Sequence, residues 1–118
     1  MATLSHIAVG LVALLHVYFL VLEMFFWDKP LGMRVFRLTL DFAKASKPLA
    51  ANQGLYNGFL AAGLIWGLSL GAAGDPIKLF FLLCVIAAGL FGALTANKKI
   101  LFVQALPGAA ALILLLIS

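Results

Sequence analysis

Residues 4–27 read LSHIAVGLVALLHVYFLVLEMFFW, an apolar run with few polar interruptions. A helix needs about 20 such residues to cross the ~30 Å hydrocarbon core of a bilayer. Three further apolar runs of comparable length follow at residues 54–73, 77–96 and 100–117. Because all four runs are continuously apolar and lack an alternation of period two, they predict membrane-spanning helices and not the strands of a β-barrel.

The composition agrees with a membrane protein. Of the 118 residues, 65% are hydrophobic and 10% are charged, whereas about a quarter of the residues of a soluble domain are charged. The mean hydropathy is +1.18. The connections after the second and third runs are short, which forces neighbouring helices to run antiparallel. We therefore predict an all-α membrane protein, with residues 1–118 forming a single domain built as an antiparallel bundle of four transmembrane helices.

The net charge of +4 originates in the loops. Seven of the eight basic residues lie in the first and third connections, whereas Lys78 lies on the other side of the predicted bundle. Cytoplasmic loops of membrane proteins carry an excess of Lys and Arg. The pattern predicts a multi-pass protein of the plasma (inner) membrane with both termini outside. It also indicates lipid headgroups, and not nucleic acid, as the partners of the basic residues.

The first connection has the pattern of a short amphipathic helix over residues 30–45. Pro30 suits a helix start, and Pro48 is expected to mark the end. Polar and apolar side chains fall on separate faces, namely Arg34, Arg37, Asp41 and Lys44 on one and Leu31, Val35, Leu38 and Phe42 on the other. We expect this helix to lie in the cytoplasmic interface, with Arg34, Arg37 and Lys44 among anionic headgroups. A solvated helical loop is the alternative.

Polar residues recur at matching positions of the four runs. His16 lies in the middle of the first run, and other polar side chains lie within about four residues of one end of their runs: Glu23, Tyr56, Asn57, Thr95 and Gln104. In an antiparallel bundle these ends meet at one depth. Because ionisable groups in hydrocarbon are costly, such a cluster is by default a candidate functional site. We predict a polar pocket open to the cytoplasm and lined by His16, Glu23, Tyr56, Asn57 and Gln104, with secondary roles for Asn52, Gln53, Thr95 and Trp27.

Helix geometry refines this prediction. His16 and Glu23 are seven residues apart, so they share nearly one face but are separated by roughly 10 Å along the axis. A water, a ligand or a side chain of another helix is needed to connect them. In the fourth run, Pro107 is expected to weaken the helix near Val103, whose carbonyl loses its usual donor.

Structural interpretations compete with the functional one. Thr95, Asn57 and Gln104 are residue types that commonly form hydrogen bonds between membrane helices. Trp27 and Tyr56 also suit interfacial anchors, and Glu23 could extend to the headgroups. Small residues four apart at Gly63, Gly67 and Gly71 either seat helices within one bundle or form a homodimer face.

One group of residues matches a known family: His16, Glu23, Trp27, the run Asn52-Gln53-Gly54-Leu55-Tyr56-Asn57-Gly58, the run Ala88-Gly89-Leu90-Phe91-Gly92 with Thr95, and Gln104 with Pro107. With these residues the chain resembles, over nearly its whole length, the small four-helix membrane family called domain of unknown function thirteen-zero-four. The stretch at residues 52–58 is the most specific part. The resemblance implies an integral membrane protein, mostly bacterial, without a settled activity.

Three classes of function are open. The leading one is binding, and transport, of a small or amphipathic molecule, with Glu23 exchanging protons or bearing charge and His16 as a deeper proton partner. In size the chain resembles small multidrug transporters, which also place a glutamate in a first helix, although their loops are shorter. The second class is a membrane-embedded enzyme acting on a lipid or quinone-like substrate, with His16 and Glu23 as an acid–base pair and Tyr56 as an oxyanion donor. The third is a structural or partner protein.

No cofactor or metal is expected. The sequence has no glycine-rich phosphate loop and no cysteine cluster, since Cys84 is the single cysteine. His6 and His16 are ten residues apart and do not share a helix face well enough for a metal site.

Overall fold

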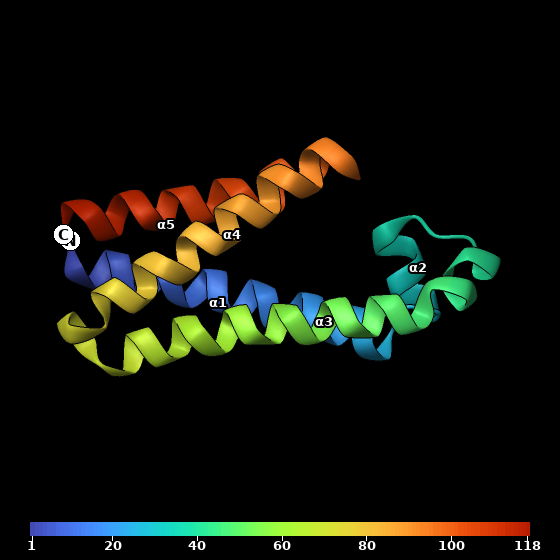
Figure 1. Ribbon diagram of the computed structural model, residues 1–118, viewed down its shortest axis with the longest axis horizontal. Coiled ribbons are helices and arrows are strands. Elements are labelled where there is room, and N and C mark those ends of the chain that lie inside the picture. The colour runs from blue at the N-terminus through green and yellow to red at the C-terminus, as the bar shows by residue number, and fades with distance from the viewer. The chain divides into compact units, whose positions relative to one another are not determined.

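A computed structural model describes residues 1–118, and every regular element in it is helical. The elements are α1 (Ala2–Phe25), α2 (Pro30–Phe36), α3 (Leu40–Ser69), the 3-10 helix η1 (Gly71–Gly74), α4 (Asp75–Thr95), the π-helix η2 (Leu101–Ala105) and α5 (Leu106–Ile117). Figure 1 shows their course along the chain. The predicted all-α fold class is therefore confirmed.

The chain divides into two compact units. Unit 1 contains residues 1–14 and 60–118, and unit 2 contains residues 15–59. The helices α1 and α3 each contribute one part to unit 1 and the other part to unit 2. The organisation as a single domain stays a prediction.

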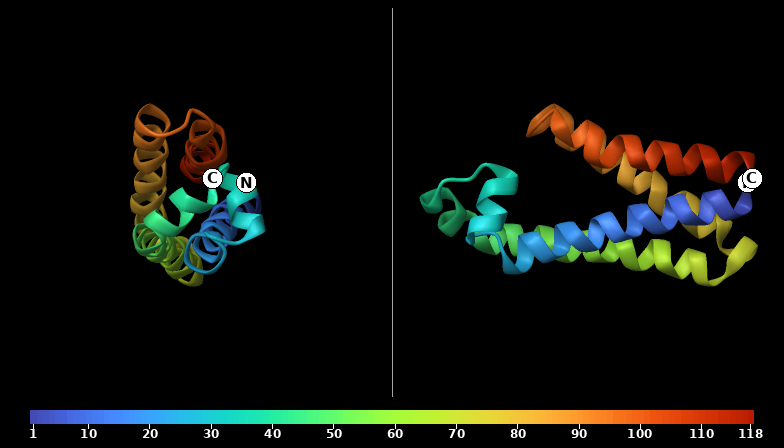
Figure 2. Two further views of the ribbon diagram at one scale, coloured as in Figure 1. Left: turned by 90° about the vertical axis from the view of Figure 1, so that its right-hand side faces the viewer. Right: turned by 180° about the vertical axis from the view of Figure 1, so that it is seen from behind.

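Unit 1 has one hydrophobic core to which four helices contribute. Its buried members are Val9, Val12 and Ala13 of α1, Leu64 of α3, Leu82 and Val85 of α4, and Ala111 and Leu115 of α5. The helices α4 and α5 lie side by side, as Figures 1 and 2 show. At one end of this unit lies η1, together with both ends of the chain, and the turn between α4 and η2 lies at the other end.

Glycines allow close helix approach within unit 1. A Cβ atom on Gly63 would collide with the Phe81 ring, and one on Gly67 would lie 2.6 Å from Lys78 Cγ. Both glycines therefore allow α3 to pack closely against α4 of the same chain. Gly71 adopts φ 60°, a left-handed conformation that favours glycine, and nothing lies within 4 Å of the position of its Cβ. A homodimer through these three residues stays a prediction.

The fourth apolar run is interrupted where proline predicts a weakened helix. Residues 101–105 form a π-helix, in which the Leu106 N–H donates to the carbonyl of Leu101 five residues back. Pro107 lies at the start of α5 and has no N–H to donate, so the α-helical pattern cannot continue unchanged through this turn. The π-helix packs closely on α4, because a Cβ atom on Gly89 would lie 2.6 Å from the Ala105 nitrogen.

In unit 2 the predicted helix over residues 30–45 is replaced by two helices. Its start at Pro30 agrees with α2, but α2 ends at Phe36. Arg37 then adopts a left-handed conformation with φ 56°, and the Leu38 N–H donates to the Met33 carbonyl, as in common helix ends. Thr39 begins α3 as an N-cap, because its Oγ1 accepts a hydrogen bond from the Phe42 N–H at 3.2 Å.

The expected helix end at Pro48 is also wrong, since Pro48 lies inside α3. The proline removes the hydrogen bond from residue 48 to the Lys44 carbonyl. Two neighbouring side chains compensate, because Ser46 and Lys47 are both bonded to the segment that follows α1. Tertiary contacts thus hold a turn that proline alone would disfavour.

Two segments are long and apolar enough to cross a membrane, Ala2–Phe25 and Gly71–Thr95, while Leu101–Ile117 is a shorter apolar segment. Helix α3 is not among them, and it ends at Ser69, before the predicted boundary at residue 73. The amides of Asn52, Gln53 and Asn57 and the many glycines lower its hydropathy. The residues that suggested a polar site are therefore the ones that weaken the signal for a span.

Candidate functional site

The centre of the candidate site is a side-chain pair within unit 2. The Asn57 amide nitrogen of α3 donates a hydrogen bond to Oε1 of Glu23 in α1. Asn57 is buried with 6% of its surface exposed, and Glu23 is partly buried. The sequence placed these two residues at one depth in separate helices, and the structure joins them directly.

Small residues on α3 bring its backbone close to α1 around this pair. A Cβ atom on Gly54 would lie 2.7 Å from Met24 Cγ, 3.1 Å from Glu23 Cβ and 3.2 Å from the Leu20 carbonyl oxygen. A Cβ atom on Gly58 would lie 2.7 Å from Leu20 Cδ1. The two glycines flank Asn57 one turn apart, so the amide is presented to Glu23 without intervening side chains from α3.

His16 lies two turns before Glu23 on α1. It is completely buried, and its ring contacts Phe19 edge-on with ring centroids 5.6 Å apart. A neutral buried imidazole offers one donor and one acceptor. The helix rise separates it from Glu23 by roughly 10 Å along α1.

The polar stretch 52–57 is divided between two faces of α3. Asn57 is buried, whereas Asn52, Gln53 and Tyr56 are exposed, Tyr56 with 50% of its surface. Tyr56 contacts Phe59 on the same exposed side of the helix. A direct role for Tyr56, Asn52 and Gln53 at the Glu23–Asn57 pair therefore stays a prediction without a supporting contact.

Two further predicted site residues, Gln104 and Thr95, belong to unit 1. Gln104 is half-buried in the π-helix η2, and π-helical turns often occur at functional positions. Thr95 is exposed, and its hydroxyl donates to the Phe91 carbonyl of its own helix at 2.7 Å. Thr95 thus bonds within α4 and not between helices. A shared site of Gln104 with Glu23 stays a prediction.

A second set of contacts fastens the end of α1 to α3. Trp27 Nε1 donates to Ser46 Oγ at 3.0 Å, and Lys47 Nζ pairs with Asp28 Oδ2 at 3.2 Å. The hydrogen bond from Lys47 lowers the pKa of Asp28 below its ordinary value. We call these four residues the α1–α3 clamp. Of these four residues only Trp27 was predicted from the sequence, in a secondary role, because pairs of residues 19 positions apart produce no periodic pattern.

Unit 1 contains a buried charge that was not among the predicted site residues. The Lys78 side chain is completely buried, and its Nζ lies 2.9 Å from Asp75 Oδ1 in an ion pair of poor hydrogen-bond geometry. The spacing of three residues on one helix could have indicated this pair. Ser5 Oγ is also buried in unit 1 without a hydrogen-bond partner.

The chemistry available at the site follows from the charge of its members. Asn57 satisfies a hydrogen bond of Glu23 but supplies no charge, and the ion pairs of the structure are Asp28–Lys47 and Asp75–Lys78. A partly buried carboxylate that lacks a cationic partner is stabilised by taking up a proton or by an external cation. The pair is therefore suited to exchange of protons or binding of a cationic group.

Comparisons with known proteins identify relatives but no activity. The family model described as "Protein of unknown function (DUF1304)" matches residues 10–116. A relative from Lactococcus lactis subsp. lactis (strain IL1403), described as "Uncharacterized protein YpaA", is 36% identical over 106 residues, which cover 88% of this chain and 89% of the relative. No solved structure matches the chain.

Proposed function

Because the chain belongs to the DUF1304 family, whose description assigns no activity, we propose its function from its own geometry: an integral membrane protein that binds, and exchanges with protons, a small cationic amphipathic molecule at Glu23. The observation that carries the proposal is the hydrogen bond between the partly buried Glu23 carboxylate and the buried amide of Asn57.

Membrane insertion is supported by how little of the apolar helices is buried. In the most apolar windows of Ala2–Phe25 and Gly71–Thr95, 28% and 22% of the residues are buried within the protein. The core helix of a soluble protein would be mostly buried. Large apolar side chains with more than half of their surface exposed include Leu14, Phe25, Phe80 and Leu94, which suits contact with lipid.

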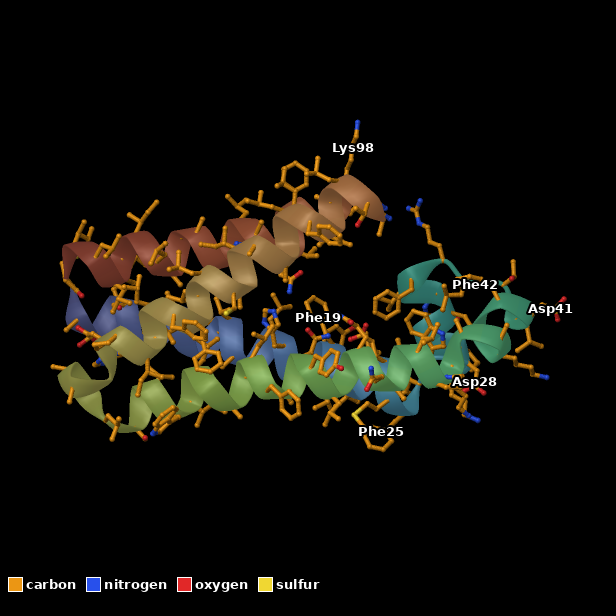
Figure 3. All side chains as sticks on the ribbon, in the orientation of Figure 1. Phe19, Phe25, Asp28, Asp41, Phe42 and Lys98 are labelled. Atoms are coloured by element: carbon orange, nitrogen blue, oxygen red, sulfur yellow. The ribbon has the colours of Figure 1, made fainter.

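A bundle of four spans is supported by the core of unit 1 and by the charges. Segments from all four predicted spans contribute to that core. The isolated basic residue on the predicted outer side, Lys78, is paired with Asp75. Lys98, at the turn between α4 and η2, points away from the helices (Figure 3). Unpaired positive charge is therefore concentrated in the first and third connections. This distribution favours a cytoplasmic location for both connections.

Selection for cations follows from the local composition of unit 2. The Glu23 carboxylate attracts positive charge, while the amide of Asn57 orients it without competing for it. Apolar residues such as Leu20 and Met24 lie beside the pair and would receive the apolar part of an amphipathic cation. The buried imidazole of His16, two turns deeper, is the proton partner that we assign to the transport path.

The test uses tetraphenylphosphonium, a lipophilic cation, as the probe. We expect the purified protein to bind it with release of a proton, and Glu23→Gln to abolish both effects. Asp41→Asn is the matched control, because it makes the same carboxylate-to-amide change at an exposed residue that points outward at the start of α3 (Figure 3). Binding that is equal in Glu23→Gln and the parent protein would contradict the proposal.

A second measurement separates binding from transport. Proteoliposomes loaded at low internal pH are expected to accumulate the probe in exchange for protons, and His16→Gln is expected to slow exchange while retaining binding at Glu23. Unchanged exchange in His16→Gln would remove His16 from the path but leave the binding site at Glu23 in place.

A further inference from the structure

We infer that the hairpin formed by α2, the turn at residues 37–39 and the first ten residues of α3 is a preformed docking surface for an anionic lipid leaflet. We call residues 30–49 the lipid platform. This inference goes beyond ligand binding at Glu23, although it shares with it the placement of the chain in a membrane.

The platform is fixed to the end of α1 before any lipid is present. A Cβ atom on Gly32 would collide with the Phe26 carbonyl, so the α2 backbone lies directly on that segment. The Phe36 ring packs on Trp27 with ring centroids 4.9 Å apart, and Trp27 in turn donates to Ser46. Because both halves of the platform contact Trp27, the hairpin has a defined shape and differs from a solvated loop.

The platform exposes several large apolar side chains. Phe42 and Leu49 are seven residues apart on one face of α3 and expose 58% and 75% of their surfaces. On α2, Leu31 and Val35 are also exposed, whereas Met33 and Phe36 are the less exposed side chains. Apolar side chains of this size, exposed on a fixed hairpin, suit contact with a nonpolar phase.

The positive charges of the platform favour a membrane surface that is negatively charged. Arg34, Arg37 and Lys44 are exposed and take no part in an ion pair, whereas the charge of Lys47 is neutralised by Asp28. Asp41 is the one acidic residue among residues 30–49. Three unpaired cations beside exposed apolar side chains are complementary to phosphate headgroups over acyl chains.

The structure also indicates which lysine matters. Lys44 and Lys47 are both exposed residues on the first turns of α3, but Lys47 is engaged in the α1–α3 clamp. Lys47→Gln alone would leave the Asp28 carboxylate uncompensated and would lower the net charge as much as Lys44→Gln does. The matched control for Lys44 is therefore the joint removal of Lys47 and Asp28, which keeps the net charge.

The first experiment measures lipid selectivity in bilayers of phosphatidylcholine containing spin-labelled phosphatidylglycerol or spin-labelled phosphatidylcholine. Each basic residue near an anionic surface contributes roughly a fivefold preference. We expect Lys44→Gln to lower the preference for phosphatidylglycerol by up to about fivefold and the combined change at Arg34, Arg37 and Lys44 to lower it further. The double variant Asp28→Asn with Lys47→Gln, which removes an ion pair without changing the net charge, should have little effect. Equal effects of Lys44→Gln and of the charge-neutral double variant would overturn the inference.

The second experiment measures depth and does not depend on charge variants that could disturb folding. In a Cys84→Ser background, a spin label at Phe42 or Leu49 is expected to be relaxed mainly by oxygen, and one at Lys44 mainly by a water-soluble nickel reagent. Relaxation of all three labels by the nickel reagent would show a solvated loop and overturn the inference. Glu23→Gln should change neither experiment, so failure of the cation site and failure of the platform are distinguishable. Extraction of the whole protein from membranes by alkaline carbonate would instead contradict the shared membrane placement.

Discussion

The Asn57 amide of α3 donates to the Glu23 carboxylate of α1, and so joins two helices by a bond in which one partner carries charge and the other does not. Glycines at positions 54 and 58 allow this contact by removing side chains from the approaching helix. The arrangement satisfies a hydrogen bond and leaves the charge available.

We expect Glu23→Gln to preserve or raise the thermal stability of the protein. A glutamine oxygen can still accept from Asn57, and the cost of a partly buried charge is removed. Asn57→Ala should lower the free energy of unfolding by about 1–2 kcal/mol, because the carboxylate loses its donor. Thermal unfolding in detergent, with Asp41→Asn as control, measures both. Strong destabilisation by Glu23→Gln would identify the pair as structural.

Substitution of three glycines by alanine should give a graded series. Gly54→Ala is expected to cost about 1–3 kcal/mol of stability, because its Cβ would meet the Leu20 carbonyl and Glu23. Gly58→Ala should cost less, because it meets only the end of the flexible Leu20 side chain. Gly10→Ala, with nothing within 4 Å of the new Cβ, should be neutral or stabilising by up to about 1 kcal/mol. Midpoints of thermal unfolding in one detergent rank the three, and equal effects would refute the close approach at Gly54.

The glycines at positions 63, 67 and 71 provide a test of whether they pack against helices of the same chain or of a second copy. Gly67→Ala would place a Cβ 3.1 Å from the Lys78 nitrogen and 3.2 Å from the Gly74 carbonyl oxygen. We expect the melting temperature to fall by the same amount at every protein concentration, because the neighbours belong to one chain. A loss of stability that grows on dilution would instead indicate the homodimer face.

The α1–α3 clamp should contribute a step to acid denaturation. The pKa of Asp28 is lowered by its hydrogen bond from Lys47, so the folded state binds this proton less readily than the unfolded state. Its contribution to stability is therefore present above the ordinary aspartate pKa of about 3.9 and is lost as the pH falls below it through the folded value. The stability lost between about pH 5 and pH 2 should be smaller in Asp28→Asn.

Lysine variants provide the matched control for this step. Lys47→Gln should reduce the acid-dependent loss in the same way as Asp28→Asn, because it removes the donor. Lys44→Gln, one turn earlier, should leave it unchanged. An identical acid profile in all four proteins would mean that the ion pair does not persist in solution.

The sequence by itself determined the helical class and the positions of most helices. A single long apolar segment in a nonpolar medium can form all its backbone N–H···O=C hydrogen bonds internally only as a helix. It also located the interruption before Pro107, since a missing N–H is a property of one residue. The depth match of Glu23 and Asn57 could be read from spacing alone, because helix rise per residue is constant.

Other features were decided by tertiary structure. Asn57 is hydrogen-bonded to Glu23, whereas the adjacent residue Tyr56 is exposed. Which of these two neighbouring residues faces α1 depends on how α3 is rotated about its axis. The continuation of α3 through Pro48 depends on bonds from Ser46 and Lys47 to residues 19 positions earlier. Local propensity measures the preference of a segment in isolation, whereas these choices follow from contacts that exist only after distant segments have packed together.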